Sequence, residues 1–335
     1  MNSVIATFGC NSSENDIRTE SSSGGAFSVL AEAIIKNGGV VYGTAMSDDC
    51  KEAIYRRVDT VDGVSSLRGS KYLQSKVGDT FKQVREDLQN GVQVMFSGCP
   101  CQVNGLKLFL RKDYDNLICM DIICHGVPSQ ELWEKYVQYF EEKNQVVLKR
   151  VNFRYKIGSS IQSFGFELKN TFSAKKDNSY MQMFLRNYDL RPSCYECASK
   201  TYRTADITIG DFWGVESIAP ELNDSRGTSL VIIRTKIGKE LFDKIADQII
   251  SAACQYEQAT EINTAEYKSV SRPKQRNSFF LDMKQLSYAE LEKKYIGPQG
   301  VRNIKKMIKK IIGRDNKNAA LANSDYGLML YYTNR

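Results

Sequence analysis

The chain carries VQVMFSGCPCQVNGLKLFLRKDYDNLICMDIICHGVP at residues 92–128, and this segment predicts an α/β fold. Two short apolar runs, 92–96 and 117–123, flank a segment whose apolar residues recur at helical spacing over 103–110. Two strands joined by such a helix form a right-handed parallel crossover, so both strands end at the same edge of a sheet. Because α/β folds bind ligands at the carboxyl ends of their strands, we expect a binding site at that edge.

Both strands of this unit are followed by a loop that carries cysteine beside glycine and proline. The first loop holds Cys99 and Cys101, the second holds Cys124, and Cys194 and Cys197 form a C-x-x-C pair further along the chain. Four thiolates from three loops are able to bind a [4Fe–4S] cluster or a structural zinc ion. Structural zinc usually takes two closely spaced pairs, so the single pair favours a cluster, with zinc and unrelated thiols as alternatives. Cys99 is a rival of Cys101 for one ligand position.

Strand and helix patterns follow one another through the rest of the chain. The expected strands are residues 3–8, 40–46, 53–60, 205–209 and 229–235, and the expected helices are 26–36, 80–88, 130–143, 180–189 and 239–250. Residues 151–155 and 164–168 alternate with period two, which predicts an antiparallel hairpin. We therefore expect a mixed, largely parallel sheet with flanking helices, an inserted antiparallel hairpin and a helical C-terminal region. The expected domains are 1–255, with the hairpin and C-x-x-C insertion at about 148–200, and a helical extension at 256–335.

The composition is that of a globular protein in a reducing compartment. The 335 residues are 42% hydrophobic and 25% charged. Apolar runs fall short of the roughly 20 residues that a membrane-spanning helix needs, and the N-terminus lacks the order of a signal peptide. Nine cysteines cannot all pair within one chain, and clustered cysteines in a reducing compartment indicate metal, cluster or catalytic chemistry. These features predict a cytoplasmic protein.

The positive charge is concentrated near the C-terminus. The formal net charge is +7, and residues 293–314 contain eight basic and no acidic residues. The remainder is nearly neutral, so the sequence predicts no nucleic-acid partner, which would need basic residues spread over a folded face. Residues 301–312 place isoleucine and valine on one helical face and lysine and arginine on the others. This pattern predicts either a helix docked on its own domain or a peripheral contact with the inner face of a membrane.

Three further loops have the composition of cofactor-binding loops. Serine and glycine at 21–25 precede the helix 26–36. At such a helix start, free backbone N–H groups are able to bind a phosphate; the alternative is an ordinary N-cap with small residues for packing. Residues 67–75 mix glycine, hydroxyls, a lysine and a tyrosine, which suits an anionic, ring-bearing cofactor or a solvated turn. The strand 205–209 is followed by GDFWG. We expect its tryptophan either to border a flat ligand or to pack in the core.

Six motifs together resemble those of the family of coenzyme F420 hydrogenase/dehydrogenase beta subunits. The resemblance runs from about residue 3 to about residue 250, in a short form without the ferredoxin-like N-terminal domain of many members. It implies FAD and a [4Fe–4S] cluster, with flavin exchanging hydride with one partner and single electrons with the cluster. In chain order, the motifs are SSGG (22–25), GSKY (69–72), PCQ (100–102), CHGVP (124–128), C-x-x-C (194–197) and DITIGDFWG (206–214).

Carried over by motif, the resemblance implies a set of site residues. The implied cluster ligands are Cys101, Cys124, Cys194 and Cys197. The implied flavin-binding residues are Ser23, Gly24, Gly25, Gly69, Ser70, Lys71, Tyr72, Gln74, Gly98, Pro100, Gln102, Gly210, Trp213 and Gly214. The candidate catalytic residues are Asp211 and His125, the only histidine in the chain. His125 is either a proton donor, as its usual pKa of roughly 6.5 allows, or a group that hydrogen-bonds a cluster sulfur or the loop backbone.

The resemblance leads to three alternative functions. The first is an iron–sulfur flavoprotein reductase of a small polar molecule, supplied by a separate protein donor such as a ferredoxin. The CHGVPS and GDFWG forms resemble a bacterial branch associated with cell-surface polysaccharide biosynthesis. The second is an electron-relay subunit of a larger F420- or ferredoxin-linked redox complex. The third, a scaffold without cofactors, is disfavoured because all the ligand and loop motifs are present.

Overall fold

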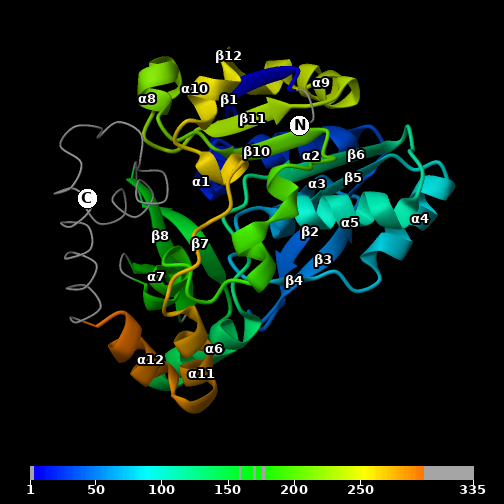
Figure 1. Cartoon of the computed structure of the whole chain (residues 1–335). Helices are drawn as coiled ribbons and strands as arrows, with labels where there is room; N and C mark the ends of the chain where they lie inside the picture. Colours follow the sequence, from blue (N-terminus) through cyan, green and yellow to red (C-terminus); the bar gives the residue numbers. More distant parts are fainter. Residues whose placement is uncertain (1–3, 158–159, 169–170, 176–177, 298–335) are drawn as a thin grey trace.

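A computed structural model describes residues 4–157, 160–168, 171–175 and 178–297 (Figure 1). Its main element is a nine-stranded mixed sheet with the strand order β12-β1-β11-β10-β6-β5-β2-β3-β4. The strands are β1 (Ala6–Ser12), β2 (Val40–Met46), β3 (Ala53–Val58), β4 (Ser75–Lys76), β5 (Val94–Gly98), β6 (Leu117–Ile122), β10 (Ile207–Asp211), β11 (Ser229–Ile233) and β12 (Ile249–Ala253). The predicted α/β class with a mixed, largely parallel sheet is confirmed.

The predicted crossover lies at the centre of this sheet. Strands β5 and β6 pair in parallel, and β2 and β10 continue the parallel pairing on either side. Helix α5 (Pro100–Leu110) joins β5 to β6 and begins three residues earlier than the apolar pattern indicated. Proline is favoured at the first position of a helix because it has no N–H to leave unpaired, which explains this early start. The carboxyl ends of these four strands therefore share one edge of the sheet.

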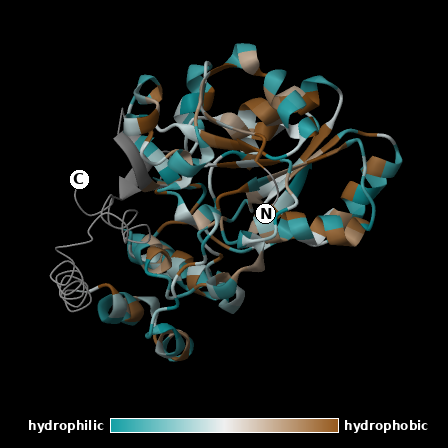
Figure 2. Ribbon diagram, turned by 45° about the horizontal axis from the view of Figure 1, so that its top comes forward, coloured by the Kyte–Doolittle hydropathy of each residue, from teal (hydrophilic) through white to brown (hydrophobic). Residues whose placement is uncertain are grey.

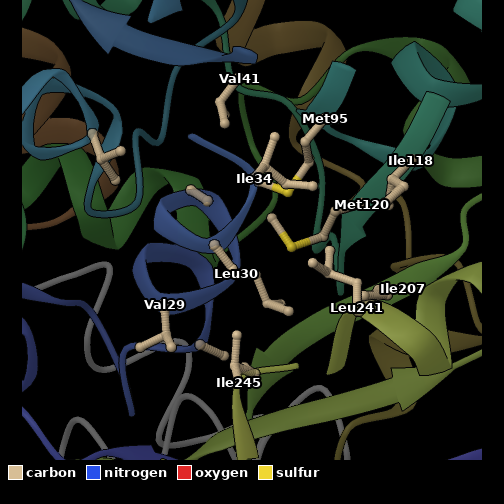
Figure 3. Close-up of a cluster of buried hydrophobic side chains, with 14 of the residues drawn as sticks. Val29, Leu30, Ile34, Val41, Met95, Ile118, Met120, Ile207, Leu241 and Ile245 are labelled. Atoms are coloured by element: carbon tan, nitrogen blue, oxygen red, sulfur yellow. The ribbon is translucent and has the colours of Figure 1, made fainter. Parts of the chain in front are cut away.

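Both faces of the parallel core are buried, because alternate strand residues pack against different helices. Residues including Val41, Met95 and Ile118 pack against Leu30 and Ile34 of helix α2 (Ala26–Lys36), together with side chains of α9 (Lys236–Asp243) (Figure 3). Their sequence neighbours pack on the opposite side against α4 (Thr80–Gln89) and α5. Figure 2 accordingly shows hydrophobic residues along the central strands. Two buried faces explain why these strands read as continuous apolar runs.

A second, aromatic core lies beside the sheet, in the lower half of Figure 1. It gathers helix α6 (Gln130–Asn144), helix α7 (Ser179–Leu185), and the helices α11 (Arg276–Gln285) and α12 (Tyr288–Tyr295). The fully buried Trp133 is at its centre, and its indole N–H donates to the Cys50 carbonyl at 2.9 Å.

The predicted hairpin is confirmed as part of a three-stranded antiparallel sheet. Strands β7 (Val151–Ile157) and β8 (Ser160–Leu168) form the expected pair, and β9 (Thr171–Lys175) adds a third strand. Phe153, Phe164 and Phe166 attach this sheet to the aromatic core. Aromatic residues at alternate positions of β7 and β8 are what make the period-two pattern visible in the sequence.

Some predicted bounds are wrong. The expected helix 239–250 ends at Asp243, and residues 249–253 instead form the edge strand β12, which pairs antiparallel with β1. In that strand Ile249 is buried whereas Ile250 is 61% exposed, so side chains alternate between inside and outside. The expected helix 180–189 ends at Leu185, because Asn187 adopts a left-handed conformation with φ 61°.

The first and last segments also differ from expectation. Strand β1 covers Ala6–Ser12 rather than 3–8, and β10 begins two residues later than expected. From residue 256 to 297 the chain is helical in short pieces, namely α10 (Tyr256–Thr260), a 3₁₀ turn at Thr264–Glu266, α11 and α12. The predicted basic helix 301–312 lies outside the described residues. Among the helices that the structure describes, none is long and apolar enough to span a membrane.

A buried ion-pair network joins four distant segments. Arg203 pairs with Asp121 of β6 at 2.9 Å and with Glu266 at 3.0 Å, and Arg234 also pairs with Glu266. All four side chains are at most 5% exposed. Burial raises the pKa of Asp121 to about 6, and the positive charge of Arg203 opposes that increase.

We expect Arg203→Met to reduce the free energy of unfolding by about 3 kcal/mol, because the buried Asp121 loses its ion-pair partner and Glu266 keeps only Arg234. Without Arg203 the folded-state pKa of Asp121 increases further above its unfolded value of about 3.9. The unfolded state then binds fewer protons, so the variant loses stability as pH rises through that folded-state pKa. Chemical denaturation at several pH values measures both effects. Arg57→Met, which removes partly exposed pairs, is the control and should cost less than about 1 kcal/mol.

Candidate active site

A cavity of about 300 Å³ lies at the carboxyl edge of the parallel strands. Its walls come from the serine loop between α1 (Asn15–Glu20) and α2, from the loops that follow β5, β6 and β10, from residues 67–75, and from α7 and residues 262–265. The predicted site residues that line it are Ser23, Gly25, Gly69, Ser70, Lys71, Tyr72, Gly98, Gln102, His125, Gly210, Asp211 and Trp213. Gly24, Gln74, Pro100 and Gly214 do not line it.

The serine loop has the features of an anion-binding loop. Gly25 caps helix α2 with φ 97°, a left-handed conformation that favours glycine. The Ser22 hydroxyl accepts from the Ser70 N–H at 2.8 Å, which joins this loop to the lysine-containing loop. Within the described part of the chain, the buried Ser21 hydroxyl has no hydrogen-bond partner, and Ser21 lines the cavity. A buried hydroxyl beside a helix N-terminus fits a phosphate group.

Gly24 positions this loop by packing rather than by contact with the cavity. A Cβ atom there would lie 2.2 Å from the Cys10 carbonyl oxygen and 2.5 Å from the Ser229 backbone nitrogen. Both are sheet backbone atoms, so neither gives way easily. The glycine therefore lets the loop lie directly against strands β1 and β11.

We expect Gly24→Ala to lower the free energy of unfolding by about 3 kcal/mol, near the upper end of the cost of overpacking. Gly105→Ala is the matched control, because its Cβ would meet the Phe81 ring at an ordinary 3.6 Å inside helix α5. That change should stabilise the protein by about 0.5–1 kcal/mol. Chemical denaturation of both variants measures the difference, and equal stabilities would contradict this account of the loop.

Lys71 places an ammonium group in the cavity wall. Its nitrogen donates to the carbonyl oxygens of Leu67 at 2.7 Å and Arg68 at 2.8 Å. Burial lowers the pKa of Lys71 to about 7. A bound anion would restore the usual pKa, so this position is suited to a phosphate or to the electron-rich part of a reduced ring.

Asp211 is held by an arginine that sequence reasoning missed. Arg154 of β7 is 5% exposed and forms an ion pair with Asp211, and its guanidinium lies 5.8 Å from the centre of the Trp213 ring. It also donates to the Tyr72 hydroxyl at 3.4 Å. These contacts bring the hairpin sheet, the GSKY loop and the GDFWG loop together in one wall. The signal in the sequence was a lone arginine between aromatic residues of a predicted strand.

His125 is also fixed in place. Its Nε2 lies 2.6 Å from the Asn187 Oδ1 atom, and its ring packs edge-on against Phe184 at 5.1 Å. Phe184 belongs to α7 and Asn187 follows it closely, and sequence reasoning did not connect this helix with the site. Phe184, Met181 and residues 262–265 are further lining residues that were missed, because they come from distant segments.

The cysteines gather behind one wall of the cavity. Cys99 and Cys124 line the cavity, whereas Cys101, Cys194 and Cys197 do not. Although the Cys101 side chain is exposed, desolvation by the surrounding protein and the charges of the Cys124, Cys197 and Cys194 thiols raise its pKa to about 11, so these four groups lie within electrostatic range of one another. The structure thus brings the four predicted ligands together, with Cys99 as a fifth thiol.

Cys99 and Cys124 interact directly. A hydrogen bond from Cys99 lowers the pKa of Cys124 to about 7, and the same bond raises the pKa of Cys99. The Val127 N–H also donates to the Cys194 sulfur at 3.4 Å. Among the described residues, no three His, Cys, Asp or Glu side chains are arranged to hold a single metal ion. Soft thiols with backbone N–H support fit an iron–sulfur cluster better than a single ion, because a cluster spreads its ligands around several irons.

Residues 91–259, half of the chain, match the family described as the C terminus of the coenzyme F420 hydrogenase/dehydrogenase beta subunit. The chain belongs to this family. The matched segment contains the crossover, all four candidate cluster ligands and the GDFWG loop. The resemblance seen in the sequence is therefore confirmed, and the F420 hydrogenase/dehydrogenase beta subunits are a family of oxidoreductase subunits.

Two proteins of Methanosarcina species are similar to this beta-subunit homologue in sequence or in fold. The F subunit of the F(420)H(2) dehydrogenase of Methanosarcina mazei is 23% identical over 260 residues, which cover 72% of this chain and 63% of that protein. The chain thus spans less than two thirds of this curated relative. The F420-reducing [NiFe] hydrogenase complex of Methanosarcina barkeri contains a chain with the same fold, with a TM-score of 0.52 and 16% identity. That similarity covers 75% of this chain and 83% of the other.

Proposed function

We propose that this beta-subunit homologue converts between hydride and single-electron transfer as part of a larger redox complex. The cavity would bind FAD, and the cysteines behind it would bind a [4Fe–4S] cluster. The observation that carries the proposal is the position of Cys124, which lines the cavity and lies within electrostatic range of Cys101, Cys194 and Cys197, which do not line it. Flavin is the cofactor that exchanges hydride on one side and single electrons on the other.

The serine loop and Lys71 would hold the phosphates of FAD. Ser21 offers a buried hydroxyl without a partner in the described structure, helix α2 offers its N-terminus, and Lys71 offers an ammonium group. The rings of Tyr72 and Trp213 would border the flat part of the cofactor. The Arg154–Asp211 ion pair keeps that wall in place, because it joins strand β7 to the loop that carries Trp213.

Cys101, Cys124, Cys194 and Cys197 would hold the cluster. Three hydrogen bonds hold the loops that carry these cysteines. Lys200 donates to the Cys124 carbonyl at 2.5 Å, and the Cys197 N–H donates to the Ser269 hydroxyl at 2.9 Å. The Val127 N–H donates to the Cys194 sulfur. Hydrogen bonds of this kind position the ligands and tune a cluster. His125, fixed by Asn187 beside Cys124, is best suited to such a supporting role.

The partner on the one-electron side would be a separate protein, as in the dehydrogenase and hydrogenase complexes named for the relatives. A second candidate function is a reductase that delivers hydride to a small polar molecule. It is favoured by the cavity itself, where Asp211 and His125 border the same space as the flavin-loop residues. A cell-surface polysaccharide intermediate is the substrate class that the sequence resemblance suggests for that function.

Anaerobic purification with flavin extraction and iron and sulfide assays tests the proposal. We expect about one FAD and about four irons per chain. Reduction trials with NAD(P)H, reduced F420 and reduced ferredoxin then identify the hydride partner and the electron partner. A protein that holds its cluster but binds no flavin, even with excess FAD, would overturn the proposed hydride conversion and leave a cluster relay.

A further inference from the structure

One face of the molecule brings the cysteines to the surface. Cys101 is exposed, whereas Cys99, Cys124, Cys194 and Cys197 are partly buried, and it occupies the first turn of helix α5. Leu108, which is 70% exposed, lies seven residues further along the same side of that helix. Tyr202, 56% exposed, lies next to this helix, because the Asn104 side chain donates to the Tyr202 carbonyl at 2.9 Å.

A second segment completes this face. Residues 265–269 run beside the C-x-x-C turn, since Ser269 bonds the Cys197 N–H and Lys200 donates to the Ala265 carbonyl. Tyr267, in the middle of the segment, is 45% exposed. We name the surface formed by residues 101–112, 191–202 and 267–275 the cysteine-side face. The face therefore presents the exposed side chains of Leu108, Tyr202 and Tyr267 on the segments that carry or flank the cysteines.

The cysteine-side face is strongly basic. Its three segments contain eight basic residues and one acidic residue, Glu196. Lys200 points inward to backbone carbonyls, which leaves a rim of seven basic residues: Lys107, Arg111, Lys112, Arg191, Lys268, Arg272 and Lys274. The chain outside residues 293–314 has 38 basic and 39 acidic residues, so this excess of positive charge is local.

We propose that the cysteine-side face is the docking surface for an acidic protein that carries a one-electron centre. An apolar centre with a charged rim is typical of a transient interface, and opposite charges steer the encounter. Each encounter would move one electron between the carrier and the cluster, one being oxidised as the other is reduced, with no bond made or broken. The inference rests on the proposed function, because it supplies the electron route that the cluster requires.

Charge reversal on the rim tests the inference with an acidic [2Fe–2S] ferredoxin as the probe. Lys268→Glu/Lys274→Glu changes two exposed residues of the rim, and Lys236→Glu/Lys244→Glu, on and just after the distant helix α9, is the matched control. At low ionic strength, we expect the rim variant to lower the second-order rate of electron transfer from reduced ferredoxin about tenfold or more. The control should stay near wild type, and added salt should remove the difference.

Four readouts separate the possible failures. Iron content and the rate of reduction by dithionite should be equal in both variants, which shows that the cluster itself is intact. Ferredoxin rates that are equal in the two variants, or a wild-type cluster that dithionite reduces but ferredoxin does not, would overturn the docking surface alone. A chain without a cluster would instead overturn the proposed function. If the rim variant lost the binding to anionic vesicles that the wild type shows, and its ferredoxin rate were unchanged, the face would be a membrane contact and the docking proposal would be wrong.

Discussion

Replacing Cys194 and Cys197 together by alanine is expected to abolish the visible absorbance of the cluster and to reduce bound iron to background. The C-x-x-C pair supplies half of the proposed ligands, and the remaining Cys101 and Cys124, even with Cys99 as a third thiol, leave a [4Fe–4S] cluster short of its four ligands. Metal binding is coupled to folding, so the variant should also unfold at a lower denaturant concentration than the loaded wild type. Iron and sulfide assays and absorbance spectra of anaerobically purified protein measure the change.

Cys254→Ala is the control for this variant. Cys254 is a half-buried cysteine that follows the edge strand β12, away from the cavity. Its replacement should leave the iron content unchanged. Full iron content in the double variant would exclude Cys194 and Cys197 as ligands.

Lys71→Met is expected to have opposite effects on flavin affinity and on the stability of the flavin-free protein. The variant should bind FAD about a hundredfold more weakly, because a buried charge-assisted contact to the cofactor is lost. The flavin-free variant should be more stable than the wild type at pH 6 by at least about 1.4 kcal/mol, the equivalent of one pKa unit. The cause is the cost of keeping an ammonium ion in the cavity wall, where its pKa falls to about 7.

The pH dependence has a definite sign. The folded-state pKa of Lys71 lies below its unfolded value, so the unfolded chain binds more protons and stability increases with pH. In the flavin-free wild type, this increase should occur between about pH 7 and about pH 10.4, and it should be absent from Lys71→Met. Lys76→Met, at an exposed ion pair with Glu52, is the control and should change neither property. A flavin-free variant that is less stable than the wild type at pH 6 would contradict this role.

The parallel core could be predicted from the sequence because its signals are local. Residues 92–128 contain two strands, their helix and both loops, and parallel pairing brings the ends of those strands to one edge without further information. The same reasoning fails for β12. Residues 244–250 have apolar positions that fit a helix, but residues 246–248 form a 3₁₀ turn and pairing with β1 makes residues 249–253 an edge strand.

The candidate site could be predicted only in part, for the same reason. The loops that follow the strands carry their own glycine, serine and cysteine signals, so they were visible in the sequence. Arg154 meets Asp211 from 57 residues away, and Phe184 meets His125 from a different helix. Such contacts depend on how the hairpin sheet and the aromatic core pack against the main sheet. No local spacing in the sequence encodes that packing.

The central claim is that one chain passes electrons between a hydride partner and its cysteine cluster. The most direct measurement is an anaerobic titration of the FAD-loaded protein with the hydride donor found in the reduction trials. Absorbance reports the flavin, and electron paramagnetic resonance reports the cluster in the same sample. The account predicts that the donor bleaches the flavin and produces the signal of the reduced cluster in the wild type, whereas Cys194→Ala/Cys197→Ala shows only the flavin change. Flavin bleaching without any cluster signal, in a wild-type protein whose cluster dithionite does reduce, would contradict it.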